Sequence, residues 1–197
     1  ILLINLGSPK KLELNSVKSY LKEFLSDDLV IDLPKPIQKF LVNFIIVPTR
    51  SKNTLEAYRT IWTKEGSPLI QNTQSIANAL AEKSQKPVAY AMRYQEPSIS
   101  EALKELMSKG CDSIKVLPLY PHYAMATSLT TINEVKEIAS KEYPQIEVSF
   151  ISSFHDGDGY INSLSKKIDQ YFTDEFDYLL FSYHGIPERH IKKTDPT

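Results

Sequence analysis

The chain has 197 residues, enough to bury one complete domain core and part of a second. Hydrophobic residues make up 42% and charged residues 24%, a balance that excludes disordered and fibrous proteins. The net charge of −1 comes from 23 basic and 24 acidic residues scattered along the chain, so we expect no nucleic-acid partner.

The single cysteine, Cys111, excludes an intramolecular disulfide and a cysteine-rich metal site built from this chain alone. A reducing, cytoplasmic location is therefore the interpretation that we favour. The sequence contains no secretory signal pattern and no apolar stretch of about 18 residues. It starts at Ile1 inside an apolar run and stops at Thr197 just past its best motif, so we expect a chain cut at both ends.

The first apolar run, residues 1–6, predicts a strand, and residues 5–9 form the turn that leaves it. Asn15 is a candidate N-cap for the helix that follows. A second helix is predicted to begin near Pro34, and a third includes Leu55. The apolar positions of these helices recur at helical spacing: Val17, Tyr20, Leu21 and Phe24; Ile37, Phe40, Leu41, Phe44 and Ile45; Leu55, Tyr58 and Trp62.

The segment from Leu33 to Val47 is unusually apolar. We favour a buried amphipathic helix here. The alternative is an exposed lip at residues 33–47 that touches an apolar ligand or a membrane, which would attach the protein to the periphery of the inner membrane.

Further along the chain, strands are predicted at residues 88–92, 113–119 and 146–151. Ser98 and Glu101 have the spacing of a capping box before a helix that Gly110 ends. A helix over residues 129–141 joins the last two of these strands. One more helix, with Tyr160, Ile161, Leu164, Ile168 and Tyr171 inward, leads to a further strand over residues 178–181.

This alternation predicts an α/β fold, a Rossmann-like domain with a four-stranded parallel sheet flanked by helices. We assign residues 1–155 to this domain. Residues 156–197 are expected to be a connecting helix and the first strand of a second, similar domain.

His184 is the first candidate for a catalytic residue. It follows the apolar run over residues 178–181 and precedes Gly185, which places an imidazole at the carboxyl end of a predicted strand. A histidine there can take a proton, bind a metal or hydrogen-bond a loop. We expect His190, six residues further on, to lie on the solvated surface.

Two other predicted strand ends carry residues suited to a flat, anionic, mostly apolar ligand, because arginine pairs with carboxylates and tyrosine offers an apolar face with a polar tip. These residues are Arg93, Tyr94, Tyr120, Pro121, His122, Tyr123, Thr127, Ser128, Thr130 and Thr131. The chain has six glycines and lacks both the dinucleotide-binding fingerprint and the phosphate loop, which argues against a nucleotide site.

Five motifs occur in the order and at the spacing found in ferrochelatases, and the whole chain resembles that family. They are Asn5-Leu6-Gly7-Ser8-Pro9, Gly66-Ser67-Pro68-Leu69, Met92-Arg93-Tyr94, Leu117-Pro118-Leu119-Tyr120-Pro121-His122-Tyr123 and Ser182-Tyr183-His184-Gly185-Ile186-Pro187. The resemblance implies insertion of ferrous iron into protoporphyrin IX to form protohaem, with iron as a substrate.

The resemblance also implies roles for particular residues. His184 falls on the family's histidine that accepts pyrrole protons or guides the metal. The implied porphyrin contacts are Leu6, Arg50, Tyr58, Ser67, Arg93, Tyr94, Tyr120, Thr127 and Ser128. The arginines would pair with propionates.

This sequence departs from the family pattern in two respects. The catalytic glutamate of the family's second domain has no counterpart, so we expect residues 1–197 alone to be nearly inactive. Met125 stands where animal enzymes carry a cysteine of an iron–sulfur cluster, so we expect no cluster and no other required cofactor. The segment from Glu188 to His190 resembles the bacterial branch.

Two alternatives stay open. One is a related chelatase that acts on coproporphyrin or sirohydrochlorin, with iron or cobalt. The other is a porphyrin- or haem-binding protein that performs no insertion. The oligomeric state is also left open.

Overall fold

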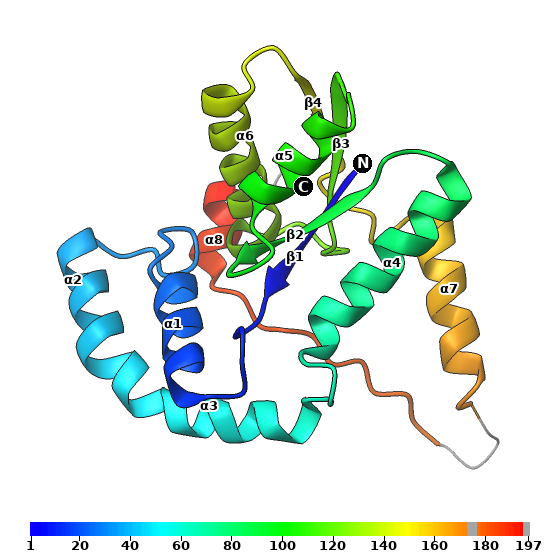
Figure 1. Cartoon of the computed structure of the whole chain (residues 1–197). Helices are drawn as coiled ribbons and strands as arrows, with labels where there is room; N and C mark the ends of the chain where they lie inside the picture. Colours follow the sequence, from blue (N-terminus) through cyan, green and yellow to red (C-terminus); the bar gives the residue numbers. More distant parts are fainter. Residues whose placement is uncertain (173–176, 195–197) are drawn as a thin grey trace.

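Four parallel strands form the central sheet of the computed structural model, which describes residues 1–172 and 177–194 (Figure 1). The strands are β1 (Leu2–Gly7), β2 (Ala89–Tyr94), β3 (Ser113–Pro118) and β4 (Glu147–Phe150), in the order β2-β1-β3-β4. Leu2 pairs with Ala89 on one side and with Val116 on the other. The predicted α/β fold and its four strands are confirmed.

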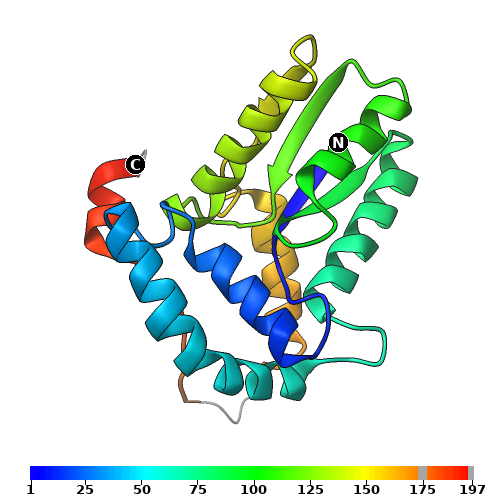
Figure 2. The same ribbon diagram turned by 60° about the vertical axis from the view of Figure 1, so that its left-hand side comes forward.

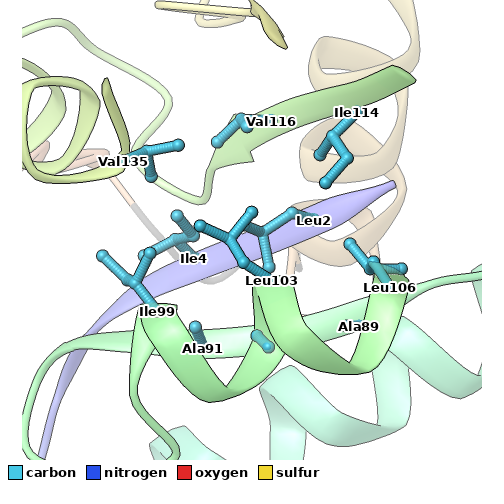
Figure 3. Packing of buried hydrophobic residues seen from close by; sticks show 11 residues of the cluster. Leu2, Ile4, Ala89, Ala91, Ile99, Leu103, Leu106, Ile114, Val116 and Val135 are labelled. Atoms are coloured by element: carbon cyan, nitrogen blue, oxygen red, sulfur yellow. The ribbon is translucent and has the colours of Figure 1, made fainter. Parts of the chain in front are cut away.

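One face of the sheet carries the main hydrophobic core. Helix α5 (Ile99–Ser108) packs there with Leu103 and Leu106 against Leu2, Ile4 and Val116, and Val135 of α6 (Thr130–Glu142) closes the cluster (Figure 3). Helix α4 (Pro68–Ser84) contacts β1 and β2. Because side chains alternate along a strand, Leu2 and Ile4 share the face that packs against α5.

The two ends of α5 match their sequence signals. The amide of Ser98 donates to Glu101 Oε2 at 2.9 Å, and the amide of Glu101 donates to Ser98 Oγ at 3.2 Å, so the capping box is formed. Gly110 has φ +75°, the left-handed conformation that ends the helix as predicted.

Helix α1 (Leu14–Leu25) begins two residues earlier than the predicted cap allows. Glu13 is the N-cap and makes no capping hydrogen bond through its side chain. The expected N-cap, Asn15, lies inside the first turn, so that prediction is wrong. The Ser16 hydroxyl instead accepts from the amide of Lys11 at 3.0 Å, which ties the preceding loop to the helix.

Helices α2 (Lys35–Phe40) and α3 (Val47–Ile61) are joined by a π-helical segment, η1 (Leu41–Ile46), where we expected two separate helices. Pro48 cannot donate a helical hydrogen bond, and its ring crowds the preceding turn. The wider π turn just before Pro48 accommodates both the missing hydrogen bond and the ring. Figures 1 and 2 show α1, α2 and α3 gathered at the carboxyl ends of the strands.

The apolar face of residues 33–47 lies outward, so the favoured prediction of a buried face is wrong. Ile37, Phe40 and Phe44 are 55%, 58% and 71% exposed, and Leu33 and Ile45 are exposed as well. The helix buries the opposite stripe, where Gln38 and Val42 lie. We call Leu33, Ile37, Phe40, Phe44 and Ile45 the apolar lip. No helix among the described residues is long and apolar enough to cross a membrane.

The segment after β4 differs most from expectation. Helix α7 (Asp158–Asp169) buries none of its residues, although Ile161 and Leu164 were expected to face inward. Residues 178–187 form neither strand nor helix, because a strand needs a hydrogen-bonded neighbour and none of the described residues pairs with this segment. The fifth predicted strand is therefore wrong for this structure, and the division of domains at residue 155 stays a prediction.

Candidate functional site

The turn that follows β1 packs directly against the end of β2. Gly7 has φ +112°, and a Cβ atom there would lie 2.0 Å from the carbonyl oxygen of Tyr94. Only glycine tolerates both this conformation and this approach. The turn places Leu6 and Ser8 at the same edge of the sheet as Arg93 and Tyr94, the predicted porphyrin contacts on β2.

Tyrosine rings line the space between α1 and α3. The ring of Tyr58 stands edge-on to that of Tyr20, with centroids 6.3 Å apart, and edge-on to Trp62 at 5.9 Å. Burial raises the pKa of both phenols, and for Tyr58 hydrogen bonding with Tyr20 and Ser8 opposes part of that rise. Both groups stay neutral at ordinary pH and act as hydroxyl donors and acceptors.

Four buried hydroxyl groups lie near the ends of β1 and β3 without a hydrogen bond of ordinary geometry among the described residues. They belong to Ser8, Tyr120, Ser128 and Thr131. Burial raises the pKa of Tyr120 to about 12, and the Thr131 hydroxyl and the charge of Arg93 oppose the rise. Ser8 and Thr131 still interact with the phenols of Tyr58 and Tyr120. Buried polar groups are normally paired, so the Ser128 hydroxyl marks a place where a ligand or water completes the bonding.

Other predicted contacts lie around this region. Ser67 is buried at the N-cap of α4 without a side-chain capping bond. Thr127, on the π-helical segment η2 (Met125–Leu129), is half-buried and its hydroxyl reaches the Ala124 carbonyl at 3.4 Å. Arg50 lies exposed on α3 and enters none of the ion pairs that the described residues form.

Arg93 and Tyr94 are bound within the protein. Arg93 Nη2 lies 2.7 Å from Asp27 Oδ2 and 3.4 Å from Glu134 Oε2, and the Tyr94 hydroxyl donates to Asp27 at 2.9 Å. Tyr94 is buried, and its pKa is raised by burial and by the charge of Asp27. Sequence reasoning missed Asp27, because nothing local distinguishes it from its neighbour Asp28.

A cavity of about 490 Å³ lies beside this network. Arg93 lines it together with Ser19, Lys22 and Glu23 of α1. The face of α1 that borders the cavity is not the buried face that carries Tyr20. The cavity therefore touches Arg93 and Tyr94 but none of the other predicted porphyrin contacts.

His184 lies exposed in the irregular segment that crosses towards α8 (Glu188–Thr194). Two contacts hold this segment near the loop after β3. Tyr183 stands edge-on to His122 at 6.1 Å, and the ring of His122 is stacked on His155 at 5.0 Å. On the other side of His184, α8 packs against η2.

His190 is 5% exposed, so its expected place on the solvated surface is wrong. It lies beside Ala124 and Met125, where α8 docks on the loop after β3. Burial lowers its pKa, and Arg189 lowers it further while Asp32 opposes the shift. Asp32 also fixes α8 through Lys193, whose Nζ lies 2.6 Å away.

The described residues bring few metal-ligating side chains together. Within residues 1–172 and 177–194 no three histidine, cysteine, aspartate or glutamate side chains gather as a metal site. Met125 is buried in η2. The absence of an iron–sulfur cluster stays a prediction.

Comparison with known proteins gives one family. The ferrochelatase family model matches residues 1–196. The ferrochelatase of Opitutus terrae is 44% identical over 198 residues, covering 99% of this chain and 57% of that protein. Those of Pseudomonas fluorescens strain SBW25 and Stutzerimonas stutzeri are each 39% identical over 198 residues, covering all of this chain and 58% of those proteins. The chain thus spans less than two thirds of the length of the curated relatives that it matches.

Proposed function

Since this chain belongs to the ferrochelatase family, we propose that the protein inserts ferrous iron into protoporphyrin IX to form protohaem, the terminal step of haem biosynthesis. The observation that carries this proposal is the family match along residues 1–196. The cluster of tyrosines and incompletely paired buried hydroxyls at the carboxyl ends of β1 and β3 supports it. Ferrous iron is a substrate here, and we propose neither a resident cofactor nor an iron–sulfur cluster.

The reaction requires a proton acceptor, because two pyrrole N–H protons leave the macrocycle as the metal enters. A neutral imidazole near pH 7 can take one of them, and we assign this role, with guidance of the metal, to His184. The resemblance assigns the second acceptor to a glutamate of the family's second domain, outside residues 1–197. One imidazole therefore supplies half of the proton transfer.

Porphyrin binding needs apolar contact with the ring and cations for its propionates. Leu6 and Tyr58 offer apolar faces, and Arg50 offers an exposed guanidinium on α3 that no carboxylate of the described residues neutralises. We propose that Ser67, Tyr120, Thr127 and Ser128 complete the contacts with hydroxyl groups.

The apolar lip provides a second surface for contact. Its exposed phenylalanines lie on the helix that also carries Lys35 and Lys39, a combination suited to the interface of an anionic membrane. We propose a cytoplasmic protein that touches the inner membrane at its periphery through residues 33–47. The same surface would let an apolar porphyrin pass from the bilayer to the site.

The decisive experiment is metallation of protoporphyrin IX by the full-length protein, with ferrous iron or zinc, followed by absorbance. His184→Ala is the test variant, and Lys192→Gln, at a largely exposed position of α8, serves as the control outside the proposed chemistry. Insertion that collapses only in His184→Ala supports the proposal. Binding without insertion by the unaltered protein would favour a porphyrin carrier, and preference for coproporphyrin or sirohydrochlorin would favour a related chelatase.

A further inference from the structure

Asp27 joins three elements at the carboxyl end of the sheet. It lies in the loop between α1 and α2, and its side chain is 9% exposed. Its Oδ2 atom accepts from Arg93 Nη2 at 2.7 Å, from the Tyr94 hydroxyl at 2.9 Å and from the Thr130 hydroxyl. Its Oδ1 atom accepts from the amide of Leu29 at 2.7 Å, which shapes the loop itself. A single carboxylate thus connects the end of β2, the start of α6 and this loop.

The guanidinium of Arg93 is committed to this network. Its Nε donates to the Thr130 hydroxyl at 3.0 Å, and Glu134 supplies a second carboxylate at 3.4 Å. The Arg93 side chain is 15% exposed. If Arg93 also paired with a propionate, a third carboxylate would approach a charge that Asp27 and Glu134 already neutralise. If Arg93 turned away from Asp27 to do so, the buried Asp27 would lose its cationic partner, which is strongly unfavourable.

The network continues into the helix that bears the apolar lip. Gln38 is buried on α2, and its Nε2 donates to the carbonyl oxygens of Asp27 at 3.1 Å and Ile31 at 3.0 Å. The same residue that holds Arg93 through its side chain therefore holds α2 through its backbone. Because Gln38 lies on the stripe opposite Phe40 and Phe44, this bond fixes the direction in which the lip faces.

We propose that Asp27 is a positioning residue that sets the apolar lip relative to the end of the sheet, with Arg93 and Tyr94 as its partners rather than as porphyrin contacts. The inference rests on the proposed function, because the quantity that it controls is porphyrin binding. It corrects the role that family resemblance assigns to these two residues. Arg93 serves the site through Asp27.

The rival role predicts an effect of opposite sign. If Arg93 bound a propionate, removing the Asp27 charge would free the guanidinium and tighten porphyrin binding. If Asp27 positions the lip, removing its charge leaves Arg93 with Glu134 as its remaining carboxylate, loosens the loop and weakens binding. Misplacement of a binding element by about 1 Å can cost up to about a hundredfold.

The first test is Asp27→Asn in the full-length protein, with Asp28→Asn as the matched control. Asp28 is the adjacent residue, largely exposed, and its ion pair is with Lys35 at the surface. We expect Asp27→Asn to raise the Kd for porphyrin, measured by fluorescence quenching, and the KM roughly ten- to a hundredfold, while kcat per folded molecule changes less than about threefold. Asp28→Asn should leave all three within about twofold.

A second variant tests the link to the lip without changing a charge. Gln38→Met keeps the length of the side chain and removes both hydrogen bonds, so we expect the same rise in Kd and KM with kcat retained. This variant keeps the test open if Asp27→Asn folds poorly, which circular dichroism of both proteins would reveal.

Deuteroporphyrin IX and its dimethyl ester separate positioning from propionate pairing. We expect Arg93→Lys to weaken binding of the acid and of the ester by the same factor. A loss confined to the acid, tighter binding by Asp27→Asn, or unchanged Kd and KM in Gln38→Met would overturn the inference. Failure of the proposed function is distinct from these outcomes, because the unaltered protein would then insert no metal.

Discussion

Gly7 shows how closely single residues are constrained at the edge of the site. Its φ of +112° is unfavourable for other residues, and the carbonyl of Tyr94 occupies the space that a Cβ atom would need. The contact joins the ends of β1 and β2, from which the site is built. A change here affects folding before it affects chemistry.

We therefore expect Gly7→Ala to lower the free energy of unfolding by about 3 kcal/mol or more, because backbone strain and overpacking add. Gly159→Ala is the control, since a Cβ atom at Gly159 would meet nothing within 4 Å and alanine favours the helix. Urea unfolding of both variants measures the difference. A Gly7→Ala protein as stable as the parent would contradict the close approach.

Two buried serines differ in a way that predicts opposite effects on stability. Ser51 and Ser128 are both 0% exposed, but the Ser51 hydroxyl donates to the Val47 carbonyl, whereas that of Ser128 has no hydrogen-bond partner among the described residues. Burying an unpaired hydroxyl is unfavourable. The folded protein tolerates Ser128 at a cost, which suits a group reserved for a ligand.

Ser128→Ala should leave the free energy of unfolding unchanged or raise it by about 1 kcal/mol, whereas Ser51→Ala should lower it by about 1 kcal/mol. Ser128→Ala should also weaken porphyrin binding. Thermal unfolding and fluorescence titration of the two variants give both readouts. A stability loss at Ser128 equal to that at Ser51 would show that its hydroxyl is already satisfied in the free protein.

At the scale of elements, the helix formed by α2, η1 and α3 is exposed where it is most apolar. The rings of Phe40 and Phe44 lie 5.5 Å apart and pack on each other rather than on the core. Val42, on the opposite stripe, is fully buried. Folding therefore depends on Val42, and the two phenylalanines remain available for a ligand or a bilayer.

We expect the double variant Phe40→Ser, Phe44→Ser to change the free energy of unfolding by less than about 1 kcal/mol, the sum of two surface effects. Val42→Ser should cost about 2–4 kcal/mol. Co-sedimentation with vesicles that contain anionic lipid should fall in the double variant. Equal sedimentation of parent and double variant would argue against membrane contact through the lip.

Helix α8 joins the segment that carries His184 to the rest of the fold, and its buried His190 makes this contact sensitive to pH. Burial lowers the pKa of His190 below its ordinary value of 6.5, so the docked helix prefers the neutral ring. Arg189 and Lys193 also disfavour the charged ring, and Asp32 favours it. The stabilisation is complete above pH 6.5 and is lost as the pH falls towards the lowered pKa.

Amide exchange of residues 188–194 should therefore be less protected at pH 5.5 than at pH 7.5, after correction for intrinsic rates. Asp32 stays ionised over this range because its pKa is lowered by its hydrogen bond with Lys193, so its ion pairs do not explain the change. The amides of α5 provide an internal reference. In His190→Leu the pH dependence should disappear, and its persistence there would assign it to another group.

At the scale of the whole molecule, the described residues make one complete four-stranded sheet, while the segment with His184 has no strand to pair with. The exposed apolar residues of 178–181 lie where the sequence predicts a second sheet to begin. The candidate base His184 thus lies outside the sheet and the helices of the described residues. Catalysis requires such a group to be held in place.

We expect residues 1–197 alone to bind porphyrin weakly and to insert zinc no faster than the His184→Ala variant of the full-length protein. The reason is that only one proton acceptor is present and its segment lacks a paired neighbour. Initial rates from absorbance, with the full-length protein as reference, measure this. Brisk turnover by residues 1–197 would sink the expectation.

Local patterns in the sequence were sufficient for the sheet and for the family. The four strands of the sheet follow from apolar runs, and the ends of α5 follow from Ser98, Glu101 and Gly110, because strand and helix-cap signals act within a few residues. The ordered motifs that end with His184 indicated ferrochelatase before any geometry was known, and the family match agrees.

Tertiary contacts decided what each side chain does. Asp27 and Arg93 are 66 residues apart in sequence, so their ion pair, and with it the commitment of Arg93, cannot be inferred from local spacing. The burial of His190 and the outward direction of Phe44 depend on which elements pack against each helix. Periodicity reports that a helix has an apolar stripe, but only long-range packing determines which stripe is buried.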